Sequence, residues 1–119
     1  MGRTQLRHFK LWYAGRSQNW ELADYEIEQI RDSFTNAVAF YPKLGDVDMA
    51  KMIQSDSFTP LDALKRATAS HDQKAFGVEF DKLTAACNAC HAATHHGFIR
   101  IRVPTASPYS NQLFGGNSR

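Results

Sequence analysis

The sequence predicts an all-α fold, a four-helix bundle with up-down-up-down topology, followed by an extended C-terminal tail. Apolar residues recur at alternating three- and four-residue spacing over long stretches, which is the period of helices with one buried face. Capping and turn residues divide these stretches into segments joined by short connections, which favour antiparallel neighbours. The length of 119 residues suits one hydrophobic core, so residues 1–119 are expected to form a single domain.

The first two helices are predicted over residues 4–14 and 19–40. The first ends at Gly15 and is apolar on more than one side, which indicates a well-buried helix or contact with a large apolar ligand. The second begins at the predicted N-cap Asn19 and ends before Pro42 and Gly45. Its apolar stripe is formed by Trp20, Ala23, Ile27, Ile30, Phe34, Ala37 and Tyr41.

Two further helical segments follow. Asp46 opens a region that contains Met49 and Met52, and a helix is expected to restart at Thr59-Pro60, with Thr59 as N-cap and proline in the first turn. Residues 70–73, Ser-His-Asp-Gln, match a capping box and predict the start of the last helix. The inward stripe of this helix is formed by Phe76, Phe80, Leu83, Cys87, Cys90 and Thr94.

The character of the chain changes after Gly97. Residues 98–103 alternate with period two, a strand signal, but no second strand is evident to pair with them. Prolines, serines, asparagines and a Gly-Gly pair follow. We therefore expect residues 98–119 to form an extended tail laid over the bundle, with a disordered end after Phe114.

The last helix carries the sequence Cys87-Asn88-Ala89-Cys90-His91, which contains both cysteines of the chain. The spacing C-x-x-C-H is the attachment sequence of c-type haem, in which both thiols add to the haem vinyl groups and the histidine becomes an axial iron ligand. On a helix, positions i and i+3 share a face. The sequence therefore predicts one covalent haem c on the last helix, at Cys87 and Cys90, with His91 as the proximal ligand.

Three alternatives remain open for the two cysteines. A redox dithiol usually needs a βαβ context, and no strand precedes the motif. A zinc site could add His95 and His96, but structural zinc sites usually separate their ligand pairs by a dozen or so residues. A disulfide between positions i and i+3 of one helix would be strained.

The opposite side of the iron has several candidate ligands. In an up-down-up-down bundle the start of the first helix, the start of the third and the end of the fourth lie at one end. His8 is ranked first, because imidazole is a strong ligand, followed by Met52 and Met49; an open site also stays possible. Among the aromatic residues, Trp12 is expected to wall the haem.

Two arginines in the tail are candidates for the haem propionates. Arg100 and Arg102 alternate with apolar residues, and guanidinium groups pair well with carboxylates. A solvated face of an extended segment explains the same pattern equally well.

Composition limits the other function classes. The net charge of +2 is too small to indicate nucleic acid or an anionic membrane, and no apolar run approaches the length of a membrane span. The N-terminus has no apolar core of a signal peptide, although bacterial c-type haem attachment takes place outside the cytoplasmic membrane. We expect a periplasmic protein whose leader is absent from the chain shown. No acid–base machinery points to an enzyme.

A mostly helical chain with C-x-x-C-H on its last helix resembles the helix-bundle monohaem cytochromes, of which the cytochrome c′ and cytochrome c-556 group is the best known. The resemblance covers roughly residues 4–96, and its first helix carries His8 where that group supplies a methionine. It implies a one-electron carrier with redox partner proteins, or a five-coordinate haem protein that binds NO or CO. A haem-bearing subunit of a larger oxidoreductase and pairing into a homodimer are further expectations.

Overall fold

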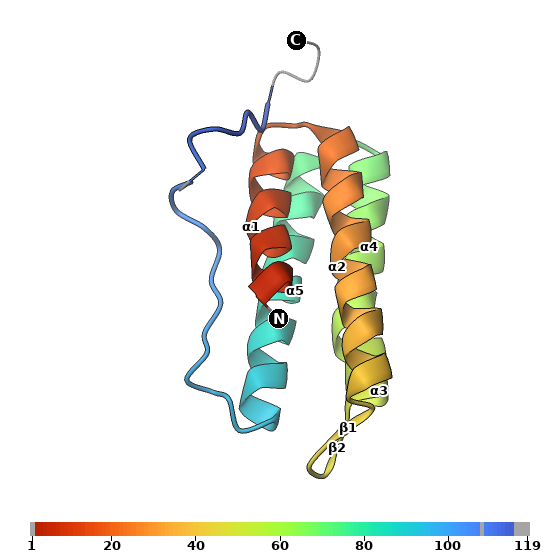
Figure 1. The fold of residues 1–119 in the computed structure, drawn as a ribbon. Coiled ribbons are helices and arrows are strands. Elements are labelled where there is room, and N and C mark those ends of the chain that lie inside the picture. The colour runs from red at the N-terminus through yellow and green to blue at the C-terminus, as the bar shows by residue number, and fades with distance from the viewer. Residues whose placement is uncertain (1, 108, 116–119) are drawn as a thin grey trace.

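The computed structural model describes residues 2–107 and 109–115. Of these residues 69% are helical, and the fold consists of four long helices and a small two-stranded hairpin (Figure 1). The prediction of a mostly helical chain is confirmed. The long helices are α1 (Gly2–Arg16), α2 (Trp20–Phe40), α4 (Phe58–Ala69) and α5 (Gln73–Ala93).

Three of these helices end in short turns that share one design. After α1, α4 and α5 the chain enters the left-handed region at Gln18, His71 and His95, with φ of 56°, 53° and 64°. In each turn the next residue donates its N–H to a carbonyl five residues back, as Asn19 does to Ala14 at 2.9 Å. This is the Schellman end of a helix, which satisfies carbonyls that the last turn leaves free.

The N-caps of α2 and α5 lie directly behind two of these turns. The Asn19 side chain accepts a hydrogen bond from the Leu22 N–H at 3.2 Å, so the predicted cap of α2 is confirmed. The cap of α5 is Asp72, which accepts from the Ala75 N–H at 3.0 Å. The predicted start of a capping box at Ser70 is therefore two residues early, because Ser70 still closes α4.

A hairpin and an irregular helix separate α2 from α4. Strands β1 (Lys43–Leu44) and β2 (Val47–Asp48) pair antiparallel and lead into α3 (Met49–Met52) and the π-helical turn η1 (Ile53–Ser57). The helix runs on into α4 without a break, so the predicted restart with Thr59 as N-cap is wrong. Pro60 lacks the N–H that would bond to the carbonyl four residues back, and that carbonyl belongs to Asp56 in the wide turn η1.

The core lies between the four long helices. Its largest members are 1% exposed or less: Leu11, Ile27, Ile30, Leu61, Leu64, Phe76, Phe80 and Leu83. Gly15 permits the close approach of α1 to α5, since a Cβ at this position would overlap the Phe76 ring. At Gly77, by contrast, a Cβ would meet no atom within 4 Å.

The tail turns back after α5 and runs alongside it towards the opposite end of the bundle (Figure 1). No strand forms in the described part of residues 98–119, so the period-two pattern reflects an extended segment with one side against the helices. Phe114, 8% exposed, packs against Phe9 and Tyr13 of α1 and anchors the far end. The predicted disordered end falls largely on residues 116–119, which lie outside the described residues.

None of the described helices is long and apolar enough to cross a membrane.

Candidate functional site

The C-x-x-C-H sequence borders a cavity of about 500 Å³ between α1, α2, η1 and α5. Cys87, Cys90 and His91 all line it from the last turns of α5. Apolar side chains line it from elements far apart in the sequence, namely Phe34, Ala37, Leu44, Met49 and Ile53, and polar side chains of Thr4, Gln5, His8 and Ser57 also border it. The motif therefore lies against the inside of the bundle, as the inward stripe of the last helix predicts.

Both cysteines are free thiols in surroundings that favour the protonated form. Burial, with a smaller contribution from the neighbouring Cys90, raises the pKa of Cys87 to about 11. Burial and the negative charge of Asp56 also raise the pKa of Cys90. Reactive dithiols have lowered pKa values and lie near helix N-termini, whereas these thiols lie in the C-terminal part of α5. The geometry thus speaks against the redox-dithiol alternative.

His91 has one ring nitrogen engaged by the tail. Its Nδ1 lies 3.1 Å from the backbone carbonyl oxygen of Ile99. A carbonyl can only accept, so the bond requires a proton on Nδ1 and leaves Nε2 of the neutral ring as a lone-pair donor. Metal-bound histidines generally make such a bond with the nitrogen that does not face the metal.

The route of the chain after α5 makes this contact. The helix ends at Ala93, and the His96 N–H bonds to the His91 carbonyl at 2.6 Å while His95 takes the left-handed conformation. The Ile99 N–H then bonds to the His96 carbonyl at 2.8 Å, which completes the reversal. These two turns reverse the chain and place the Ile99 carbonyl beside His91.

The tail is held to the motif a second time, at Asn88. The Asn88 Nδ2 donates to the Ile101 carbonyl at 2.8 Å, and the Ile101 N–H donates to Asn88 Oδ1 at 2.7 Å. Sequence reasoning missed both Ile99 and Asn88 as site residues. The only signal that bears on them is the alternating pattern of residues 98–103, which indicates an extended chain without naming its partner.

His8 lines the cavity from α1 and is 4% exposed. Its Nε2 lies 2.8 Å from the Thr84 hydroxyl, which itself donates to the Phe80 carbonyl at 3.0 Å. The Thr84 hydroxyl has one proton and gives it to the Phe80 carbonyl. The proton in the bond between His8 and Thr84 must therefore be on His8 Nε2. Burial lowers the pKa of His8 to about 4, so the ring is neutral at physiological pH.

The other predicted ligands divide between the cavity and the core. Met49, 8% exposed, lines the cavity. Met52 is not among the lining residues and packs against the core instead. Trp12 is not among them either: its ring lies 5.0 Å from that of Phe80, and the Arg16 guanidinium lies 5.7 Å from its centre. Trp12 therefore does not wall this space as expected: the cavity is lined by the first two turns of α1 as far as His8, and Trp12 lies one turn further along the helix.

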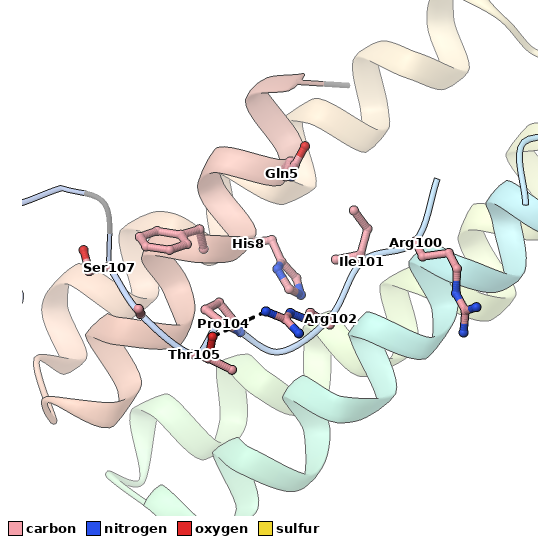
Figure 2. A pocket seen from close by; sticks show the side chains of 10 residues that line it. Gln5, His8, Arg100, Ile101, Arg102, Pro104, Thr105 and Ser107 are labelled. Atoms are coloured by element: carbon pink, nitrogen blue, oxygen red, sulfur yellow. Dashed lines mark hydrogen bonds between the residues drawn. The ribbon is translucent and has the colours of Figure 1, made fainter. Parts of the chain in front are cut away.

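Arg100 and Arg102 line a neighbouring open cleft of about 540 Å³ between α1 and the tail. Figure 2 shows Arg102 turned towards His8 and Thr105, with its Nη2 3.5 Å from the Thr105 hydroxyl, whereas Arg100 points away. The two spaces share His8 and Ile101 as lining residues. Neither arginine lines the apolar cavity itself, since the alternation of the tail turns Ile101 rather than its neighbours towards it.

Among the described residues, no three side chains of His, Cys, Asp or Glu come together in a way that could hold a metal ion. His96 lines the cavity, but its Nδ1 lies 3.3 Å from the Thr94 hydroxyl. His95 is exposed. The zinc alternative, which needs both histidines beside Cys87 and Cys90, thus gains no support.

Comparison with models of known protein families, with characterised proteins and with solved structures gives no match.

Proposed function

We propose that this protein is a monohaem c-type cytochrome that acts as a one-electron carrier, with haem attached at Cys87 and Cys90 and His91 as the proximal ligand. One observation carries the proposal: the thiols and the imidazole of a C-x-x-C-H sequence line one apolar cavity, and the Nδ1 of that imidazole is bonded to the Ile99 carbonyl. A motif match alone would not require either feature.

The residues present fit a haem. The cavity of about 500 Å³ lies within the range of roughly 300–1,000 Å³ typical of cofactor sites, and its lining is mainly apolar. Thioether formation adds an S–H bond across a vinyl double bond, so it consumes protonated thiols and needs no oxidant. The chemistry supplied by a bound haem is the reversible gain and loss of one electron at iron.

We also propose that the four long helices form an up-down-up-down bundle. Tight turns at residues 17–19 and 70–72 join α1 to α2 and α4 to α5. An up-down-up-down bundle with the haem between its helices accounts for a cavity lined by α1, α2 and α5 together. The fit of this arrangement rests on the chain course in Figure 1.

For the distal side, His8 and Met49 are the candidates that line the cavity. His8 is neutral, so binding iron would require no loss of a proton from a charged ring. It would, however, have to exchange its bond to Thr84 for one to the metal. A methionine ligand would raise the reduction potential relative to a second histidine.

The bond between His8 and Thr84 also favours a second candidate function, the binding of NO or CO. With Nε2 donating at 2.8 Å to the Thr84 hydroxyl, the histidine has no free lone pair on that nitrogen for a metal, and the distal side would be an apolar space. A five-coordinate haem there would bind NO or CO. Periplasmic location and redox partner proteins follow from the electron-carrier proposal, since bacterial c-type haem is attached outside the cytoplasmic membrane.

The experiment is co-expression with a c-type haem maturation system, followed by denaturing electrophoresis and mass measurement. The proposal expects one haem that survives denaturation, and complete loss of covalent haem in a variant with both Cys87→Ser and Cys90→Ser. Ala89→Ser is the matched control, because Ala89 lies between the cysteines with an exposed side chain. Absence of covalent haem in the wild-type chain would refute the proposal.

Absorption spectra then separate the two functions. A low-spin spectrum that carbon monoxide does not change supports the electron carrier, and its loss in His8→Leu or in Met49→Leu identifies the distal ligand. A high-spin spectrum that shifts with carbon monoxide supports gas binding and removes both distal candidates.

A further inference from the structure

We propose that Asn88, the first variable residue of the C-x-x-C-H sequence, is a positioning residue for His91: it clamps the tail at Ile101 and thereby holds the Ile99 carbonyl against His91 Nδ1. The inference rests on the proposed function, because it concerns how the chain orients the haem ligand.

The clamp is a pair of reciprocal hydrogen bonds. The side-chain amide of Asn88 donates to the Ile101 carbonyl at 2.8 Å and accepts from the Ile101 N–H at 2.7 Å. An amide side chain offers a donor and an acceptor side by side, so it can satisfy both backbone groups of one residue. Ile101 lies in a segment without a strand partner among the described residues, and Asn88 takes the place of that partner.

The spacing of the two contacts couples them. Asn88 and His91 are three residues apart on α5, about 4.5 Å along the helix axis and on one face. Ile101 and Ile99 are two residues apart in an extended chain, about 6.6 Å. The chain reverses after His96 and passes antiparallel to the helix. When the tail is fixed at Ile101, the Ile99 carbonyl is therefore held close to His91.

The consequence falls on the imidazole. While the Ile99 carbonyl accepts from Nδ1 at 3.1 Å, the ring is held in one tautomer and one orientation, with Nε2 available to the cavity. The carbonyl also makes the ring a stronger electron donor, which favours the oxidised form of a metal bound to Nε2. Without the clamp the bond opens more often, and a ligated iron becomes easier to reduce.

A purely structural role for Asn88 would predict something different. If the Asn88 side chain only fastens the tail to α5 and does not affect His91, its loss loosens the tail but leaves the reduction potential unchanged. The reduction potential is thus the readout that separates a positioning residue from a covering one.

The test uses the full-length, haem-loaded protein in four forms: wild type, Asn88→Ala, Asn88→Asp and the control Ala89→Ser. Asn88→Asp keeps the acceptor for the Ile101 N–H and loses the donor to the Ile101 carbonyl. Its Ile101 amide exchange is expected to lie between those of wild type and Asn88→Ala, so it serves as the second variant for that measurement should Asn88→Ala fold poorly; its added negative charge lowers the reduction potential by itself, so its potential is not used to judge the clamp. Amide hydrogen exchange and the reduction potential are measured for each.

We expect Asn88→Ala to speed exchange of the Ile101 amide by roughly fivefold or more, as loss of a hydrogen bond does in a local opening. We expect its potential to rise relative to Ala89→Ser. Unchanged Ile101 exchange, or faster exchange with an unchanged potential, would overturn the proposal.

Failure of the proposed function is distinguishable from failure of this inference. If the wild-type chain takes up no covalent haem, the proposed function fails, and the ¹⁵N shifts of the His91 ring in the full-length haem-free chain still test the clamp. The clamp predicts a proton on Nδ1 in wild type and a mixture of tautomers in Asn88→Ala. Equal tautomer ratios in both would refute it.

Discussion

Replacement of Thr84 by valine tests the bond that keeps His8 in place. Valine has nearly the same shape as threonine, so the change removes the hydroxyl while the volume stays filled. His8 and Thr84 are 4% and 7% exposed, and their bond is 2.8 Å long. After the substitution the His8 Nε2–H, buried and neutral, has lost its acceptor.

The expected cost follows from that unpaired donor. A buried polar group left without its partner costs about 1–3 kcal/mol of unfolding free energy. With a urea dependence of about 1–3 kcal/mol per molar for small proteins, the unfolding midpoint should fall by roughly 1 M. Urea titration followed by circular dichroism measures it.

The chain supplies a matched control at Thr68. Thr68 is 3% exposed, and its buried hydroxyl has no hydrogen-bond partner among the described residues. The same change to valine there removes a buried hydroxyl that makes no bond, and should leave stability unchanged or raise it by about 1 kcal/mol. If Thr84→Val proves as stable as Thr68→Val, the reasoning about His8 is wrong.

The same variant reports on iron ligation. A His8 that binds iron through Nε2 can no longer donate to Thr84, so the penalty of Thr84→Val should then persist in the haem-free chain and vanish in the haem-loaded protein. An equal penalty in both forms would indicate that His8 stays with Thr84 and does not bind iron, which leaves Met49 or an open distal side.

Two further predictions concern the fold around the site. Gly15→Ala should destabilise the protein by about 1–3 kcal/mol, because the new methyl group overlaps the buried Phe76 ring; Gly77→Ala, in open space, should stabilise it by up to about 1 kcal/mol, and equal urea midpoints for the two variants would contradict this. Burial raises the pKa of Glu26 above 4.5 despite Arg7 at 3.2 Å, so the folded chain binds this proton more tightly than the unfolded chain and loses stability as pH rises from 4.5 through the raised pKa. The stability of wild type minus that of Glu26→Gln should therefore fall over this range, and a difference that rises with pH would show that Arg7 outweighs burial.

The sequence is most informative about this fold where the chemistry is local. The apolar stripe and the Asn19 cap predict α2 to within a residue, since both depend only on neighbours along the chain. The ends of α1 and α5 are harder to predict. The left-handed residue that ends a helix is usually glycine, but here it is Gln18 and His95. The sequence does not predict the turn η1, because Pro60 in a helical pattern indicates the start of a new helix.

In the site, too, the local features can be predicted from the sequence and the long-range contacts cannot. The C-x-x-C-H sequence carries its own chemistry, so it can be recognised without a structure. The contacts of Ile99 and Ile101 depend instead on two turns that reverse the chain after α5. No periodicity specifies such a reversal, since the partners of a single extended segment are set by tertiary packing.

A group bound in the apolar cavity, as proposed, would contribute to the stability of this chain. The cavity of about 500 Å³ opens to solvent, so an occupant would stabilise the chain by removing the apolar lining from water, at about 25 cal/mol per Å². The total stability of a domain is about 5–15 kcal/mol. A covalent occupant that fills the space would thus add to the stability, and the haem-free variant with both Cys87→Ser and Cys90→Ser should unfold at a lower urea concentration than the haem-loaded wild type. Comparable midpoints for the two would mean that the cavity closes on itself without haem, and would remove the argument that it is shaped around one.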